Sequence, residues 1–224
     1  MPNARFNDFA AAGLALAAPS LCGGCGDALP TLPSIAGSLP TGWCTHCFDR
    51  WGPTPGAWQG APDACPGWAA AEYRGRVRRA LLQAKRGAPE AAIGLLLHRL
   101  QLQPGSLPSG AHITWVPGHP RRALRGPDAG QALARAVARQ EGRTVERLLW
   151  RVPWARRQAG RTVDERCANP HRLGLRAVGR APSCVVLVDD VRTTGTTLDH
   201  AARLLRSAGA DHVVACTVAI APPR

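Results

Sequence analysis

Hydrophobic and polar residues follow two different periods along the last two thirds of this chain. Apolar residues recur at helical spacing over Glu72 to Lys85 and over Pro89 to Gln103. The later segments are interpreted as strands at Ile113 to Val116, Thr144 to Val152, Val185 to Val188 and His212 to Ile220, and as helices at Ala129 to Gln140 and Thr197 to Ser207. Strands that alternate with helices predict an α/β fold with a parallel sheet flanked by helices.

The first seventy residues differ from the rest. They are rich in Gly, Pro, Cys and Trp and show no long periodic pattern, as expected of a small module held together by a metal or disulfides. We therefore expect a small module over residues 1–70 and an α/β domain over residues 71–224. Between Pro153 and Ala181 lies a long arginine-rich stretch without a clear period, and such long connections are usually functional or mobile.

Basic residues outnumber acidic ones strongly. The formal net charge is +13, and almost all of the cations are arginine. This charge favours a polyanionic partner such as nucleic acid, although a genome biased toward arginine codons would give the same composition. Lys85 is the single lysine, which suggests a place where a compact ammonium is wanted for a phosphate, unless it was retained by chance at a solvated helix end.

No apolar run approaches the roughly 20 residues that a membrane-spanning helix needs. The apolar segment Phe9 to Ala18 is preceded by a single arginine, and neither a cleavage site nor a lipoprotein site follows it. We therefore expect a cytoplasmic protein without membrane insertion.

Four of the eight cysteines form two pairs with the same spacing. Cys22 and Cys25 make the first pair, and Cys44 and Cys47 make the second. Paired Cys-x-x-Cys spacing in a chain expected in a reducing compartment indicates a structural Zn²⁺ site, in which four thiolates close a tetrahedron. Accidental pairing or a redox dithiol is the alternative. Tryptophans near these cysteines, at 43, 51, 58 and 68, are interpreted as a small core or as a stacking surface for single-stranded bases.

A run of acids and hydroxyl residues follows the predicted strand Val185 to Val188. Asp189 and Asp190 end this strand, where ligands bind in open α/β sheets, and adjacent carboxylates can hold two vicinal hydroxyls. Hydroxyl and backbone N–H groups at a helix start favour a phosphate, and here they come from Thr193, Thr194, Gly195, Thr196 and Thr197. Arg192 adds positive charge. The run therefore predicts a sugar-phosphate pocket, although capping of the helix would explain one or two of these residues.

The run from Val185 to Thr197 resembles the 13-residue fingerprint of type I phosphoribosyltransferases. Over almost the entire chain the sequence is also similar to the competence protein F (ComF) family, related to the gluconate-utilisation protein GntX, whose members have a zinc ribbon in front of such a domain. The resemblance includes these segments: Tyr73 to Gly87, Val116 to Arg122, and Gln158, Arg166 and Asn169. The usual Arg-Gly-Phe-Asn-Gln of the family is replaced by a longer loop from Arg125 to Gln131.

This resemblance implies a type I phosphoribosyltransferase-like sheet behind a zinc ribbon. It also implies binding of phosphoribosyl pyrophosphate (PRPP) with Mg²⁺, and a cytosolic role in DNA uptake during natural transformation. Single-stranded DNA and other uptake proteins, such as a helicase, are the implied partners. Groups for pyrophosphate or DNA phosphate are expected at Lys85, Arg86, Arg121 and Arg122.

Three functional hypotheses follow from the sequence. The chain is a DNA-uptake factor that binds single strands and retains the pocket, a metabolic phosphoribosyltransferase, or a regulator in which PRPP tunes DNA binding. No segment specifies an acceptor base, so whether the pocket catalyses transfer stays open.

Overall fold

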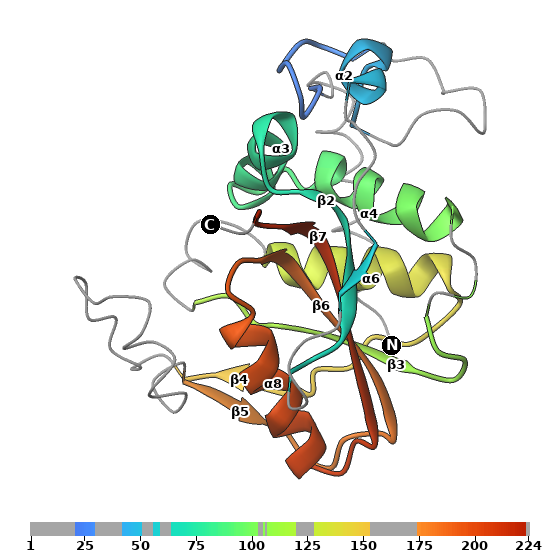
Figure 1. Ribbon diagram of the computed structural model, residues 1–224, viewed down its shortest axis with the longest axis vertical. Coiled ribbons are helices and arrows are strands. Elements are labelled where there is room, and N and C mark those ends of the chain that lie inside the picture. Colours follow the sequence, from blue (N-terminus) through green and yellow to red (C-terminus); the bar gives the residue numbers. More distant parts are fainter. Residues whose placement is uncertain are drawn as a thin grey trace, which may run out of the picture.

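The computed structural model describes residues 21–29, 42–50, 56–58, 64–102, 105, 107–119, 128–152 and 174–222. Figure 1 shows their architecture, an α/β arrangement around one central sheet. The sheet has five strands in the order β1 (Ala57–Trp58), β2 (Gly67–Glu72), β7 (His212–Ile220), β6 (Cys184–Arg192) and β3 (His112–Trp115). All neighbouring pairs are parallel except β1 with β2. The predicted fold class is therefore confirmed.

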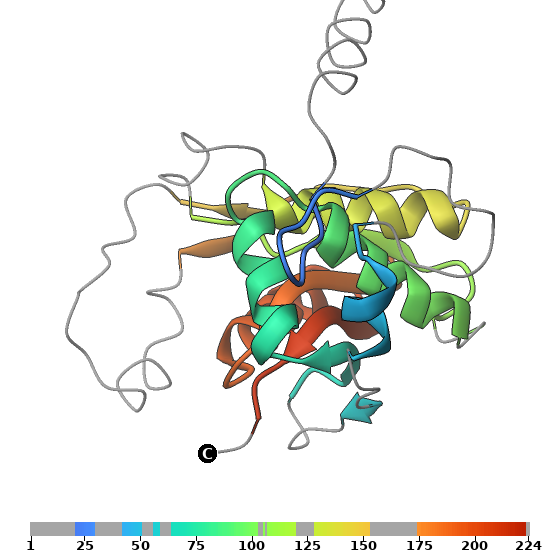
Figure 2. The same cartoon turned by 90° about the horizontal axis from the view of Figure 1, so that it is seen from above.

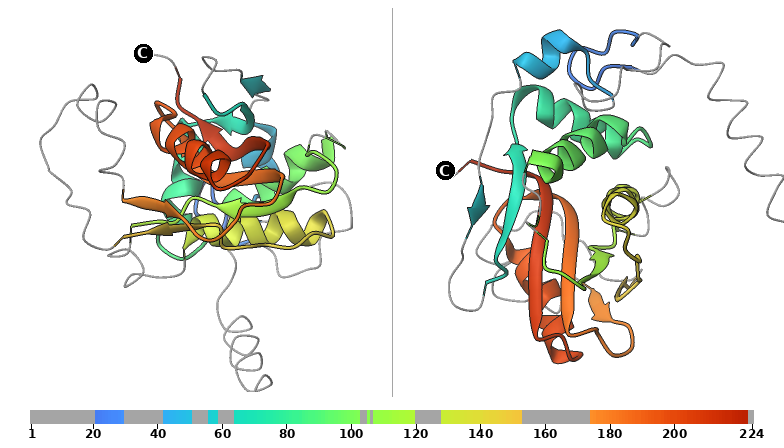
Figure 3. Two further views of the ribbon diagram at one scale, coloured as in Figure 1. Left: turned by 90° about the horizontal axis from the view of Figure 1, so that it is seen from below. Right: turned by 90° about the vertical axis from the view of Figure 1, so that its right-hand side faces the viewer.

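Helices cover both faces of this sheet. On one face, α4 (Glu90–Leu102) contacts β2 and β7, while α6 (Ala129–Gln140) contacts β3 and β6. On the other face, α8 (Thr196–Ser207) contacts β6 and β7. The right-hand view of Figure 3 shows α6 and α8 on opposite sides of the strands. Both faces of β6 and β7 are thus removed from water, which explains the nearly continuous apolar runs of their sequences.

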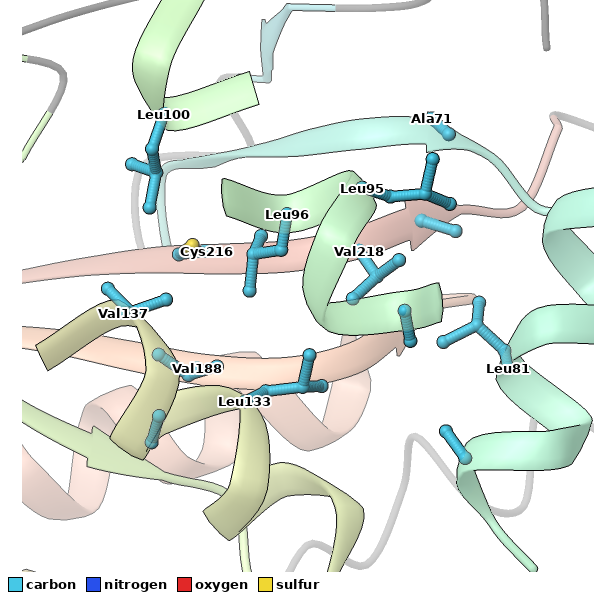
Figure 4. Packing of buried hydrophobic residues seen from close by; sticks show 14 of the residues in the cluster. Ala71, Leu81, Leu95, Leu96, Leu100, Leu133, Val137, Val188, Cys216 and Val218 are labelled. Atoms are coloured by element: carbon cyan, nitrogen blue, oxygen red, sulfur yellow. The ribbon is translucent and has the colours of Figure 1, made fainter. Parts of the chain in front are cut away.

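The core under α4 and α6 is built from aliphatic side chains that interdigitate. In Figure 4, Leu95 and Leu96 of α4 lie over Val218, and Leu133 of α6 lies over Val188. All five of these side chains are completely buried. Leu81 joins the same cluster from α3 (Gly75–Ala84), so the helix that carries Lys85 at its end is fixed by core packing.

A separate two-stranded sheet lies beside the main one. It consists of β4 (Leu149–Arg151) and β5 (Leu175–Ala177), which pair antiparallel. The strand predicted over Thr144 to Val152 is therefore only partly formed. Val145 makes an isolated parallel bridge with Ile113, and the chain then leaves the main sheet to pair with β5.

The predicted boundary at residue 70 falls inside β2. Its residues Ala69 to Ala71 are completely buried or nearly so, and the strand is paired with β7. The residue types of this strand give little sign of it, because alanine lacks the β-branched and aromatic side chains that mark strands. The main sheet thus starts within residues 1–70, the segment expected to form the small module.

Candidate functional site

The two acids of the pocket lie at the carboxyl end of β6. The strand buries Val185 to Val188 completely and continues through both aspartates to Arg192. The Asp190 N–H donates to Asp189 Oδ1 at 2.8 Å, and the Val191 N–H donates to Asp190 Oδ1 at 2.8 Å. Each carboxylate is therefore oriented by the backbone N–H group that follows it.

Lys85 reaches this acid pair from the end of α3. Its Nζ lies 2.6 Å from Asp190 Oδ2, and the two side chains are 29% and 19% exposed. A half-buried, charge-assisted contact of this kind is stronger than a solvent-exposed ion pair. The single lysine thus does not lie on a solvated helix end. Its predicted contact with a ligand phosphate stays a prediction, as does that of Arg86, which is exposed one residue further on.

Asp189 is held in an environment that disfavours its charge. Burial, and next the neighbouring Asp190 carboxylate, raise the pKa of Asp189 well above its usual value, and Lys85 offsets only part of this. A carboxyl that is reluctant to ionise can donate a hydrogen bond to a sugar hydroxyl as well as accept one. Asp189 can therefore serve a sugar hydroxyl as donor or as acceptor.

Replacing Asp189 by asparagine should stabilise the protein at neutral pH. An unfolded aspartate ionises near pH 4, whereas folding holds Asp189 protonated to higher pH, so the wild type loses stability as pH rises between these two values. The neutral asparagine avoids this loss and can still accept from the Asp190 N–H. We expect a gain in the free energy of unfolding that is largest at pH 8 and shrinks toward pH 4, measured by urea denaturation. A gain that does not depend on pH would contradict this account of Asp189.

The turn after the acids forms the start of α8. Gly195 is the N-cap residue and has φ +85°, a left-handed conformation that other residues rarely adopt. The Thr194 and Thr196 hydroxyls lie 2.9 Å apart on this turn, and Thr193 and Thr194 are exposed. The first N–H groups of a helix lack intrahelical partners, so this turn presents donors where a phosphate binds favourably.

Arg192 lies against the same turn. A Cβ placed on Gly195 would be 2.9 Å from Arg192 Nη2, so the guanidinium occupies the space beside the glycine. On its other side, the Arg192 Cζ lies 5.1 Å from the centre of the Trp58 ring, within the range of a cation–π contact. Trp58 therefore helps to hold the cation of the predicted phosphate site.

Residues before the α/β pattern also fix the start of α8. The Cys65 N–H donates to Asp199 Oδ1 at 2.8 Å, and the Trp58 Nε1–H donates to the Cys65 carbonyl at 2.9 Å. Sequence reasoning missed the roles of Cys65 and Asp199, and it interpreted Trp58 as part of a small core or of a stacking surface. No local signal could have found the contact between Cys65 and Asp199, because it joins residues 134 positions apart.

Several predicted site residues lie outside the described part of the chain. They are Arg121, Arg122, Gln158, Arg166 and Asn169, together with residues 125–127 at the start of the loop from Arg125 to Gln131. The pyrophosphate side of the predicted pocket therefore remains a prediction. Of the segment expected on this side, Val116 to Arg122, the structure describes Val116 to His119, which directly follow β3.

The four paired cysteines meet at one point. The sulfurs of Cys22, Cys25, Cys44 and Cys47 all lie within 4.8 Å of one another. Cys44 Sγ is 3.6 Å from Cys22 Sγ and 3.9 Å from Cys25 Sγ. Zinc bound by four thiolates at about 2.3 Å would set its sulfurs about 3.8 Å apart, so the cluster fits a zinc ribbon.

Backbone N–H groups favour the thiolate form that a metal requires. Burial by itself raises the pKa of Cys22, but N–H groups of Cys44, Cys25 and Gly24 outweigh it and lower that pKa to about 6. The N–H groups of Gly24 and Cys44 both lie 3.4 Å from Cys22 Sγ.

The cysteine module is docked on α3 and α4 and shares their core. Figure 2 shows it from above, lying over these helices. The Trp43 Nε1–H donates to the Ala91 carbonyl at 2.8 Å, and Arg79 Nη1 donates to the Gly24 carbonyl at 2.9 Å. A Cβ on Gly23 would lie only 2.3 Å from Ala91 Cβ, which shows how closely the two parts approach. Trp43 and Trp68 are 3% and 6% exposed and belong to the cluster that also holds Leu81, so they lie in a core shared with the α/β domain. Trp51 lies outside the described residues.

Comparison with known proteins identifies the class of domain. The family described as phosphoribosyl transferase domain matches residues 175–224, which include β6, the acid pair, the turn and α8. The chain thus contains a phosphoribosyltransferase-like domain. No curated protein matches.

One solved structure that the chain matches in part is described as the allosteric regulatory enzyme of purine biosynthesis. It aligns with a TM-score of 0.40 and 23% sequence identity, over 60% of this chain and 25% of that one. The alignment therefore spans about a quarter of that protein's length.

Among the described helices, none combines the length and the apolar composition that a bilayer crossing requires.

Proposed function

We propose that this protein binds PRPP at the carboxyl end of β6 and handles single-stranded DNA, as expected of a ComF-like protein of natural transformation. One observation carries the PRPP assignment. A single continuous run places two backbone-oriented carboxylates, a left-handed glycine and a helix N-terminus in succession, with Lys85 bound to the second acid. This order matches a ribose followed by its 5′-phosphate.

Each part of the proposed ligand has a matching group. Asp189 and Asp190 would hold the two ribose hydroxyls. The 5′-phosphate would be bound by Arg192 and by the turn that consists of Thr193, Thr194, Gly195, Thr196 and Thr197. Lys85 lies on the acid pair and would approach the anomeric side, where the pyrophosphate leaves the sugar. Mg²⁺ would enter with PRPP, bound mainly by ligand oxygens, because it keeps its octahedral geometry through substrate phosphates and few protein carboxylates.

The DNA-handling part of the proposal is supported by charge and by the architecture. The net charge of +13 suits a polyanion, and a zinc ribbon docked on a phosphoribosyltransferase-like domain is the arrangement that the ComF resemblance implies. In this proposal the protein acts in the cytoplasm, together with other uptake proteins such as a helicase.

Calorimetric titration with PRPP and Mg²⁺ tests the pocket. We expect saturable binding to the wild type and a rise in the unfolding temperature with PRPP concentration, because a ligand that binds only the folded state stabilises it. Replacing Asp189 and Asp190 together by asparagine should abolish both effects while the protein stays folded. The matched control is Asp211→Asn, which changes an exposed carboxylate directly before β7, at the opposite end of β6 and β7 from the acid pair. Stabilisation that survives in the double variant would show that the pocket lies elsewhere.

An active phosphoribosyltransferase is the second candidate, favoured by the unbroken acid pair and turn in the matched segment. It requires release of pyrophosphate from PRPP in the presence of an acceptor base. A broad panel of bases and amines, assayed for pyrophosphate, separates it from a binding protein. PRPP that binds without turnover with any acceptor would argue against transfer.

A further inference from the structure

The outer face of the small β4–β5 sheet differs from the rest of the described surface. Three large hydrophobic side chains are strongly exposed among the described residues, Leu21, Trp150 and Val178, and two of them lie on or beside this sheet. Trp150 is 41% exposed and pairs directly with exposed Arg176 across the strands. An exposed indole on a sheet face requires a reason, because apolar surface in water is unfavourable.

Core packing fixes which way these side chains point. Leu149 and Leu175, the neighbours of Trp150 and Arg176 along each strand, are 1% and 5% exposed and belong to the core beneath α8. Since side chains alternate along a strand, Trp150 and Arg176 must face outward together. Figure 1 shows the small sheet at the side of the molecule, next to α8. The indole is thus presented by a rigid strand.

Among the described residues of the two strands and their flanks the charge is positive from Arg147 onward, and the acid that precedes Arg147, Glu146, pairs with His112. The segments 147–152 and 174–180 hold four arginines and no acid. The Arg147 Cζ lies 4.1 Å from the centre of the Trp150 ring, so its guanidinium stacks on one face of the indole. Arg147, Arg176 and Arg180 are all exposed. We name this surface, made of Arg147, Trp150, Arg176 and Arg180, the hairpin face.

We propose that the hairpin face binds single-stranded nucleic acid, with a base stacked on Trp150 and phosphates paired with the arginines. This inference rests on the proposed function and assigns its DNA-binding surface. Sequence-tolerant single-strand sites combine an aromatic platform with a positively charged track, and the hairpin face offers both. Unpaired bases expose the ring faces that such a platform needs, whereas a duplex stacks its own bases internally.

The hairpin face is tied to the approach of the pocket. The Arg151 Nε–H donates to the Pro117 carbonyl at 2.8 Å, which fixes the end of β4 beside the segment that leaves β3. Directly before β4, the Leu148 N–H donates to Thr114 Oγ1 of β3 at 3.3 Å. A single strand on the hairpin face would therefore pass close to the carboxyl end of β3, one strand away from the acid pair on β6.

Fluorescence anisotropy with a labelled 25-residue oligothymidylate at low salt tests the assignment. We expect Trp150→Ala to weaken binding by about five- to a hundredfold, the effect of losing one stacked base. Trp150→Phe should retain most of the affinity, because a ring remains. Arg147→Ala with Arg176→Ala should reduce the slope of log K against log salt concentration by about 1.4, because two phosphate contacts are lost. The matched control removes two exposed arginines of α6, Arg135 and Arg139, and should leave the slope unchanged.

The outcomes separate the surface from the function. A wild type that does not bind the oligonucleotide even at low salt overturns both the DNA-handling proposal and the hairpin face. Normal binding by Trp150→Ala and by the double arginine variant overturns the hairpin face alone. Equal affinity for a duplex, or displacement of the oligonucleotide by polyglutamate at equal charge, would identify the surface as a general anion site. PRPP-dependent stabilisation should persist in every hairpin variant, which confirms that each is folded.

Discussion

Replacing Cys47 by serine, or removing the metal with a chelator, is expected to destabilise the phosphoribosyltransferase-like domain as well as the cysteine module. Cys47 and Cys22 are completely buried and belong to the same hydrophobic cluster as Leu81 and Leu95. Structural zinc sites in small peptides contribute about 10–16 kcal/mol of apparent binding energy, so this loss should exceed the usual 0.5–3 kcal/mol of a point mutation. Thermal unfolding with a measurement of zinc content checks it.

The control for this variant is Cys184→Ser, which changes a half-buried cysteine of β6 that is not one of the four paired cysteines. It should keep one zinc per chain and nearly the wild-type unfolding temperature. A Cys47→Ser protein that still holds one zinc and unfolds at the wild-type temperature would show that the four cysteines are not a closed metal site.

The metal should also influence the pocket, because helix α3 contacts both. Arg79 of α3 donates to the carbonyls of Gly24 and Cys25. Lys85 directly follows the last turn of the same helix and pairs with Asp190. Loss of the cysteine module would free the start of α3 and loosen Lys85. Metal-depleted protein that remains folded should therefore bind PRPP more weakly than the metal-loaded form.

Replacing Gly195 by alanine is expected to lower PRPP affinity at least tenfold. The φ of +85° costs an alanine about 1 kcal/mol, and its Cβ would lie 2.9 Å from Arg192 Nη2. The guanidinium must then move away from the turn, and the turn itself must relax toward another φ. Both changes disturb the donors that are proposed for the 5′-phosphate. Calorimetric titration gives the affinity, and urea denaturation gives the stability.

Gly142→Ala is the matched control for the strain alone. Gly142 has φ +62°, and an added Cβ there meets nothing within 4 Å. It should lose only the stability that the strain costs, which is less than Gly195→Ala loses, and it should bind PRPP normally. If both variants bind PRPP as the wild type does, the turn after β6 does not hold the phosphate.

Most elements of the α/β domain could be predicted from periodicity. The helix over Ala129 to Gln140 and the strand over His212 to Ile220 have the predicted bounds, because each has a strong apolar pattern with clear ends. The strands β2 and β5 were missed. The first is built mainly from alanine, and the second is three residues long within an arginine-rich segment, so neither carries a strong local signal.

The sequence by itself determined the chemistry that can be present: two Cys-x-x-Cys pairs, an acid pair, a hydroxyl-rich turn and an excess of arginine. These are local patterns, in which the spacing along the chain fixes the geometry of the turn or strand end. Only the tertiary structure decided which distant groups join them. It set Lys85 on Asp190, Trp58 on Arg192 and the cysteine module on α3, and it turned Trp150 outward. Such contacts depend on sheet order and helix packing, which no local pattern encodes.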